Sequence, residues 1–278
     1  RPPMTGWLRY DGSGLVPAGP PGAPAGAVEA ADSWLVDGGR VRGLDRHWAR
    51  FERACADAGT DRPAVAGLRA AVEHALPATG RWFPRVELRA GGELRLAVRP
   101  APPRDPAVVA WVSDREDPRR VPRRKGPDLE RLGDLRAQAE RHGAGEALLT
   151  DASGRLLEGA YTSLLWWEDD ELWAVPDDAP ILDGVTRRLV LELARHDGVP
   201  VRFGRPAPAD LAGREAWLTS ALHGIRAVTG WADGAPAAEP RRAGAWQERL
   251  EALAEPPTFS ARGARSAGRG GSASRSPG

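Results

Sequence analysis

Two glycine turns constrain the fold of the first part of this 278-residue chain. Asp37-Gly38-Gly39 and Gly91-Gly92 each separate two short stretches rich in strand-forming residues. Glycine readily takes the positive φ angles of tight turns, so each site predicts an antiparallel hairpin. Apolar residues also recur with helical spacing over 44–59 and 63–76. We therefore predict an α+β fold for this part, with antiparallel strands and two helices.

The rest of the chain predicts a second, larger mixture of helices and strands. The expected helices cover 129–142, 186–197 and 245–254. The expected strands cover 108–112, 147–150, 156–159, 164–167, 172–175, 199–203 and 216–219. The expected domains are a loose lead-in over 1–27, a small α+β domain over 28–105, a large α+β domain over 106–255 and a disordered tail over 256–278. The tail prediction follows from its Gly, Ser, Ala, Arg and Pro composition.

The charge balance and the cysteine count exclude several classes of protein. The net charge is +1, and the tail over 256–278 carries four arginines and no acid, which leaves a slightly acidic body. We therefore expect no nucleic-acid partner. Cys55 is the only cysteine and no run of 18 apolar residues occurs, so we expect a reducing, cytoplasmic location and no membrane span. No signal peptide is visible, Met4 is a candidate start, and no metal site is expected.

Lys125 is the only lysine in the chain and lies in the run 119–125 beside four arginines. Arginine keeps its proton in proteins, whereas a desolvated lysine can lose it and form a Schiff base with a carbonyl compound. The run also fits an ordinary solvated surface, on which a single lysine would have no chemical role. Taken alone, the lysine leaves both interpretations open.

Three further segments supply groups that could act together with this lysine. Glu158 follows an apolar strand and precedes Gly159-Ala160, so it is either a solvated turn residue or a carboxylate directed into a pocket. Asp183-Gly184-Val185-Thr186 precedes a helix, where it fits an anion site or an ordinary helix cap. Thr219-Ser220-Ala221 offers a second hydroxyl-bearing turn. Pyridoxal 5′-phosphate needs this set: a lysine for its aldehyde, a carboxylate for its ring nitrogen and donors for its phosphate.

The order and spacing of these residues resemble the class IV aminotransferases, the fold-type IV pyridoxal phosphate enzymes. This family includes branched-chain and D-amino-acid aminotransferases and 4-amino-4-deoxychorismate lyase. The resemblance covers about 33–228, and the segments that carry it are His47-Trp48-Ala49-Arg50-Phe51, Lys125, Glu146–Asp151 with Gly154, and Leu182–Arg187. It implies a two-domain, D-amino-acid aminotransferase-like α+β fold with the cofactor between the domains, and a homodimer.

The resemblance also assigns roles to individual residues. Lys125 falls at the Schiff-base lysine. The positions implied to bind the cofactor are Arg50, Glu158, Gly184, Val185, Thr186, Ser220 and Ala221, with Glu158 at the ring nitrogen and the others at the phosphate. Three departures concern the substrate side: Ala30-Ala31-Asp32-Ser33 replaces the family's Gly-Asp-Gly-x-Phe-Glu-Thr run, Ser163 replaces a frequent asparagine, and tyrosines are few.

The sequence thus predicts an aminotransferase that acts on an amino acid, a small-molecule amino substrate, through a Lys125 Schiff base. Arg89, His223 and Ser33 are candidate substrate-binding residues, although each also fits an ordinary strand or loop position. The alternative is 4-amino-4-deoxychorismate lyase, because the small apolar turn over 219–222 resembles the corresponding turn of that enzyme. A distant alternative is a non-catalytic binding protein on the same scaffold, or an RNA-associated protein that uses the arginine tail.

Overall fold

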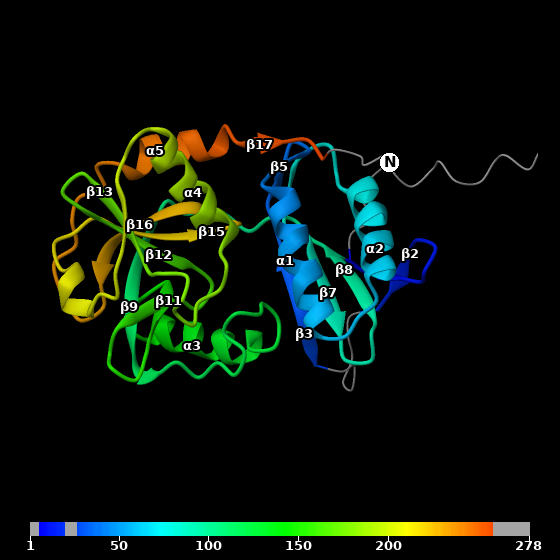
Figure 1. Cartoon of the computed structure of the whole chain (residues 1–278), viewed down its shortest axis with the longest axis horizontal. Helices are drawn as coiled ribbons and strands as arrows, with labels where there is room; N and C mark the ends of the chain where they lie inside the picture. The colour runs from blue at the N-terminus through cyan, green and yellow to red at the C-terminus, as the bar shows by residue number, and fades with distance from the viewer. Residues whose placement is uncertain (1–5, 20–26, 258–278) are drawn as a thin grey trace, which may run out of the picture.

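The computed structural model describes residues 6–19 and 27–257, which form two lobes that lie side by side (Figure 1). Both lobes contain sheet and helix, as the predicted α+β fold requires. The expected disordered tail over 256–278 lies almost wholly outside the described residues. Among the helices of the described ranges, each is too short or too polar to cross a membrane.

The small lobe is built on a five-stranded antiparallel sheet with the order β2-β1-β8-β7-β3. Its strands are β1 (Gly6–Tyr10), β2 (Leu15–Ala18), β3 (Val28–Ser33), β7 (Arg85–Arg89) and β8 (Leu94–Val98). The expected loose lead-in over 1–27 is wrong where the structure describes it, because β1 and β2 form a hairpin that extends the sheet. The predicted hairpin around Gly91-Gly92 is confirmed, and both glycines have positive φ.

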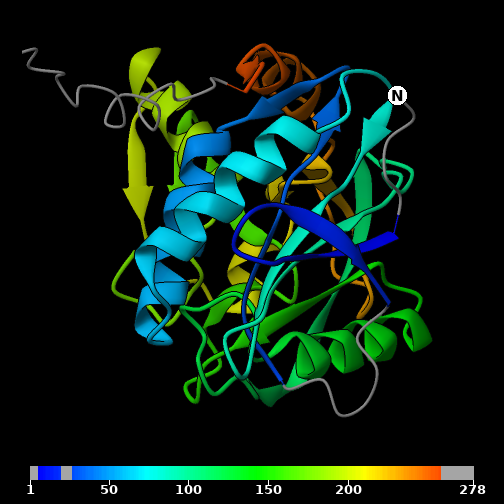
Figure 2. The same ribbon diagram turned by 90° about the vertical axis from the view of Figure 1, so that its right-hand side faces the viewer.

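Two helices cover the small lobe: α1 (Leu44–Asp57) and α2 (Arg62–Ala75). Figure 2 views the molecule from the side of the small lobe, and these helices lie next to each other there. The apolar stripe of α1 is buried, and Trp48, Phe51 and Cys55 have no exposed surface. Trp48 packs against Trp34 with the ring centroids 5.3 Å apart and the ring planes tilted by 53°. This packing fixes the rotation of α1 about its axis and so directs Arg50 toward the other lobe.

A second, four-stranded sheet of the order β17-β5-β4-β6 joins the C-terminal end of the described chain to the small lobe. Its strands are β4 (Val36–Asp37), β5 (Arg40–Arg42), β6 (Arg81–Trp82) and β17 (Ala254–Glu255). The β4–β5 pair is the hairpin predicted from Asp37-Gly38-Gly39. β17 pairs with β5, so the end of the expected large domain reaches onto the small lobe, at the top of Figure 1.

The large lobe is an eight-stranded sheet with the order β11-β10-β9-β16-β15-β12-β13-β14. Its strands are β9 (Ala107–Glu116), β10 (Glu146–Thr150), β11 (Leu156–Gly159), β12 (Ser163–Glu168), β13 (Glu171–Ala174), β14 (Val201–Phe203), β15 (Ala216–Ser220) and β16 (Gly224–Trp231). Its helices are α3 (Leu129–Arg141), α4 (Val185–His196), the 3₁₀ turn η1 (Pro208–Leu211) and α5 (Ala243–Glu251). The predicted helices and strands are found within a few residues, but β16, a central strand, was not predicted.

Candidate active site

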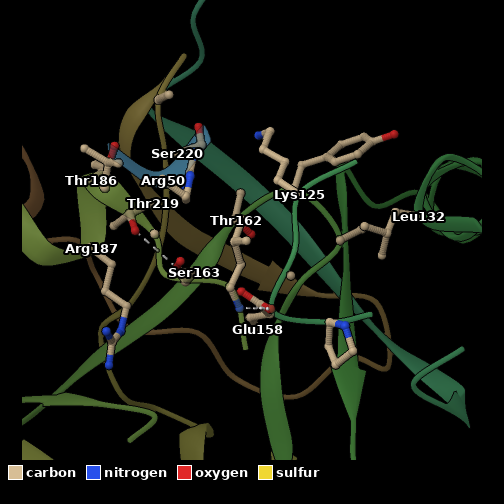
Figure 3. Close-up of a pocket in the computed structure, with 18 of the residues that line it drawn as sticks. Arg50, Lys125, Leu132, Glu158, Thr162, Ser163, Thr186, Arg187, Thr219 and Ser220 are labelled. Atoms are coloured by element: carbon tan, nitrogen blue, oxygen red, sulfur yellow. Dashed lines mark hydrogen bonds between the residues drawn. The ribbon is translucent and has the colours of Figure 1, made fainter. Parts of the chain in front are cut away.

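The predicted lysine, carboxylate and turns line one cavity (Figure 3). The empty space there is about 690 Å³ when the solvent at its open mouth is included. The predicted residues that line it are Lys125, Arg50, Glu158, Gly184, Val185, Thr186, Ser220 and Ala221. In Figure 3, Arg50, Thr186 and Ser220 lie toward one end of the cavity and Glu158 toward the other.

Lys125 is held by a backbone contact between the lobes. It lies on the segment between β9 and α3, and its carbonyl accepts a hydrogen bond from the Ala31 N–H of β3 at 2.8 Å. The next residue, Gly126, has a φ of 141°, and a Cβ there would lie 2.8 Å from Ala30 Cα. Only glycine fits this approach. The small residues Ala30 and Ala31 of β3 therefore allow this strand to lie close to the backbone of the lysine segment.

The Lys125 amine lies in surroundings that favour its neutral form. Burial lowers the pKa of Lys125 to about 8, and the charges of Arg50 and Arg85 act in the same direction. Asp32 and Glu158 act against this shift. Because an amine attacks carbonyls and accepts protons only in its neutral form, Lys125 is suited to both roles near neutral pH.

Glu158, near the end of β11, is buried and forms an ion pair with Arg119. Its Oε1 accepts hydrogen bonds from Arg119 Nη1 at 2.5 Å and from the Leu182 N–H at 2.8 Å. Burial raises the pKa of Glu158 to about 7, and Arg119 works against that rise. Because both of these bonds reach Oε1, the second carboxylate oxygen is available to a ligand group in the cavity.

Arg119 also belongs to the site, although it was not distinguished in the sequence from the other arginines of the run 119–125. Its Nε and Nη2 donate to Asp117 at 2.9 and 2.8 Å, and Nη2 also donates to the Pro180 carbonyl at 3.0 Å. These bonds fix the guanidinium against Glu158. The spacing of Asp117 and Arg119 could have indicated this role, since a carboxylate two residues away can orient an arginine.

Asp32 is the second residue that was missed, and it orients Arg50. Asp32 is fully buried; its two oxygens accept bonds from Arg50 Nε and Nη2, each at 2.8 Å, and one oxygen also lies 2.8 Å from His47 Nδ1. Burial alone would raise the pKa of Asp32, but Arg50 and His47 hold that pKa below its usual range. Arg50 Nη1 donates to the Asp183 carbonyl at 2.9 Å. Of the five N–H groups of Arg50, these bonds leave two for an anion in the cavity.

The two predicted anion turns lie on the same side of the cavity. Gly184 precedes the first turn of α4, whose N–H groups and dipole attract negative charge. A Cβ on Gly184 would lie 2.4 Å from Ser163 Oγ, so this turn packs closely against the Ser163 side chain of β12. Thr186 is buried beside it, and Ser220 ends β15.

The three predicted substrate-binding residues lie outside this cavity. Arg89 is on β7 and bonds Glu87 at 3.0 Å. His223 accepts a bond from the Asp105 N–H at 3.2 Å through Nδ1, and burial lowers the pKa of His223 to about 4. Ser33 is buried at the end of β3. None of these three residues lines the cavity that contains Lys125.

The lowered pKa of Lys125 predicts its reactivity. Acetylation of the protein by acetic anhydride, followed by peptide mapping, should show that the rate at Lys125 rises from pH 6 and levels off above about pH 8 to 9. In urea-unfolded protein the rate should keep rising toward the usual lysine pKa of about 10.4. Identical profiles for the folded and unfolded protein would contradict the desolvated environment of the amine.

Comparison with known proteins gives a consistent family. The sequence profile described as amino-transferase class IV matches residues 29–231. Aminodeoxychorismate lyase of Bacillus subtilis (strain 168) is 32% identical over 78 residues, which are 28% of this chain and 27% of that protein. Branched-chain-amino-acid aminotransferase of Escherichia coli (strain K12) is 35% identical over 66 residues, 24% of this chain and 21% of that protein. The matched segments thus span about a quarter of each of these relatives.

Solved structures show the same fold over nearly the whole chain. A hypothetical aminotransferase from Mycobacterium tuberculosis, in its PLP-bound form, superposes with a TM-score of 0.74 at 22% identity and covers 90% of this chain and 98% of that one. The family profile covers well over half of the sequence, and the fold agrees with it. The chain belongs to the class IV aminotransferases, a family of pyridoxal phosphate-dependent enzymes.

Proposed function

We propose that this protein is a pyridoxal phosphate-dependent aminotransferase in which Lys125 holds the cofactor covalently. The observation that carries the proposal is the position of the only lysine. It lies in one cavity with a buried carboxylate and two turns that can bind an anion, and its pKa is lowered to about 8. A lysine on an ordinary solvated surface would have none of these neighbours.

The groups that line the cavity fit the cofactor's three chemical demands. Two free N–H groups of Arg50, the start of α4 with Thr186, and Ser220 supply donors for a phosphate. Glu158 supplies an anionic acceptor for a protonated ring nitrogen, whose positive charge would lower the pKa of Glu158 further. Lys125 supplies the amine. The phosphate donors and Glu158 lie toward opposite ends of the cavity (Figure 3), as a rigid ring with a phosphate arm requires.

When bound, pyridoxal phosphate supplies an electron sink for the charge that develops at the α-carbon of an amino substrate. The residues of the cavity would supply the proton transfer and the binding contacts. The free Lys125 amine would take the proton from the α-carbon of the substrate as general base. Glu158, oriented by Arg119, would accept a hydrogen bond from the protonated ring nitrogen. Arg50 and the two turns would hold the phosphate.

Trapping with borohydride tests the covalent attachment. We expect that protein loaded with pyridoxal phosphate and reduced with sodium borohydride carries one pyridoxyl phosphate group, which peptide mapping by mass spectrometry finds on Lys125. The assignment is unusually clear because the sequence contains no second lysine ε-amine.

The matched control is Lys125→Arg, which keeps the positive charge but has no amine. This variant should show neither the label nor the visible absorbance of the loaded protein. A wild-type protein that stays colourless with excess cofactor and takes up no label would refute the proposal.

Replacement of Glu158 tests the electronic role of the carboxylate. Glu158→Gln keeps the side-chain shape but loses the charge, so we expect turnover to fall by about 10- to 100-fold, because a charge-assisted hydrogen bond contributes roughly 1.5–3 kcal/mol. Borohydride labelling of Lys125 should persist. Glu130→Gln, an exposed change on α3, serves as the control and should leave turnover unchanged. Equal turnover in both variants would show that Glu158 is not the ring-nitrogen partner.

The second candidate reaction is that of 4-amino-4-deoxychorismate lyase, favoured by the 32% identity with the Bacillus subtilis enzyme over 78 residues. Both reactions begin with proton removal by the lysine, and the shape of the substrate pocket decides between them. The proposal predicts that D-alanine, L-glutamate or L-leucine yields more than one equivalent of its 2-oxo acid per active site only when a 2-oxo acid acceptor is present. Release of pyruvate and 4-aminobenzoate from aminodeoxychorismate, without an acceptor, would establish the lyase instead.

The proposal includes a small-molecule amino substrate, a homodimer and a cytoplasmic location. The family resemblance suggests the homodimer, and the lone Cys55 suggests a reducing compartment.

A further inference from the structure

A polar cluster lies behind the second anion turn, on elements that the proposed chemistry does not use. It consists of Arg42 on β5, Arg104 on the link between the lobes, and Gln247 and Glu251 on α5. We call these four residues the C-terminal clamp. The turn that they contact runs from Ser220, the last residue of β15, to Ile225, the second residue of β16.

Each of three clamp residues bonds the backbone of the turn. Arg42 Nη2 donates to the Ala221 carbonyl at 2.9 Å, and Arg104 Nη2 donates to the His223 carbonyl at 3.1 Å. Gln247 Oε1 accepts from the Ile225 N–H at 2.7 Å. The turn is thus held at both ends and in its middle by side chains from outside it.

Glu251 holds the other three clamp residues together. Its Oε1 lies 3.1 Å from Arg42 Nη1, accepts a bond from Gln247 Nε2 at 2.5 Å, and also bonds Arg104. One carboxylate therefore serves two arginines, of which Arg42 is almost fully buried. Removal of that carboxylate would leave two like charges close together without their shared partner.

The shape of the turn is matched to the clamp. Gly224 has a φ of 74°, and a Cβ there would lie 2.4 Å from Gln247 Oε1. Inside the turn, Ser220 Oγ accepts the His223 N–H at 3.2 Å, which leaves the Ser220 hydroxyl hydrogen free to donate to a ligand. The turn carbonyls that bond Arg42 and Arg104 are occupied on the clamp side. The Ser220 hydroxyl hydrogen is therefore the side-chain donor of the turn that is available to an anion.

We infer that the C-terminal clamp is a positioning device that fixes the Ser220–Ala221 turn for phosphate binding, so that α5 sets the affinity of the site for a phosphate-bearing ligand. The inference rests on the proposed function, because it assumes that this turn receives the cofactor's phosphate. The clamp residues touch no reacting atom. They act on the ligand through the backbone of the turn.

Electrostatics and positioning predict opposite effects of one substitution. Glu251→Gln removes a negative charge near the turn, so Coulomb attraction alone would tighten phosphate binding. Loss of the shared carboxylate would release Arg42 and Arg104 from the turn. The phosphate donors of the turn would then be less well fixed, and phosphate binding would weaken. The inference states that the second effect dominates.

The test compares pyridoxal phosphate with pyridoxal, which lacks the phosphate. We expect Glu251→Gln to raise the dissociation constant for pyridoxal phosphate by about tenfold, the loss of one well-made hydrogen bond, and to leave that for pyridoxal unchanged. Glu248→Gln, an exposed change on the same helix, should alter neither. In the cofactor-free protein, hydrogen exchange over 220–226 should be faster in Glu251→Gln than in Glu248→Gln.

Several outcomes would overturn the inference. Unchanged or tighter binding of pyridoxal phosphate by Glu251→Gln would show that the clamp does not position the turn. Equal wild-type affinities for pyridoxal phosphate and pyridoxal would show that the turn holds no phosphate, while borohydride labelling of Lys125 decides the proposed function separately. If Glu251→Gln fails to fold, Arg42→Lys, which keeps the charge but loses the forked donors, should show the same selective loss.

Discussion

The hydrogen bond between the Ala31 N–H and the Lys125 carbonyl, at 2.8 Å, is the contact on which the site depends. It joins a strand of the small lobe to the lysine segment of the large lobe. Gly126 allows the backbones to approach, and Ala30 and Ala31 are small enough to receive them. Asp32 follows on the same strand and orients Arg50. A single close backbone contact therefore brings the groups of both lobes together around one amine.

The charges around the cavity are arranged in fixed pairs, and the lysine is left outside them. Asp32 pairs with Arg50, and Asp117 and Glu158 share Arg119. Paired charges are held in place and contribute strong local fields, whereas an unpaired buried amine tends to lose its proton. This division explains why a chain that uses arginine elsewhere keeps one lysine. The guanidinium groups provide permanent charge, and the amine provides a group whose charge can change.

The sequence predicted local features well and long-range pairing poorly. Glycine turns and helical periodicity located the hairpins and α1 to α5, because those signals are local. β16 was missed because Arg226 and Thr229 interrupt its apolar run, and its place in the sheet depends on β9 and β15 on either side. The cavity-lining residues were found through their family motif. Asp32 and Arg119 were not, because a charged residue in a sequence is usually on the surface and only the folded chain shows its partner.

The pairing of β17 with β5 has a mechanical consequence for the molecule. The lobes are connected covalently where the chain passes from β8 to β9, and a second time where α5 continues into β17 and adds a strand to the sheet of the small lobe. A body attached at two separate points can swing only about the line that joins them. A rotation of the lobes about this line would leave both connections in place. Sliding and twisting of the lobes past each other would require β17 to detach.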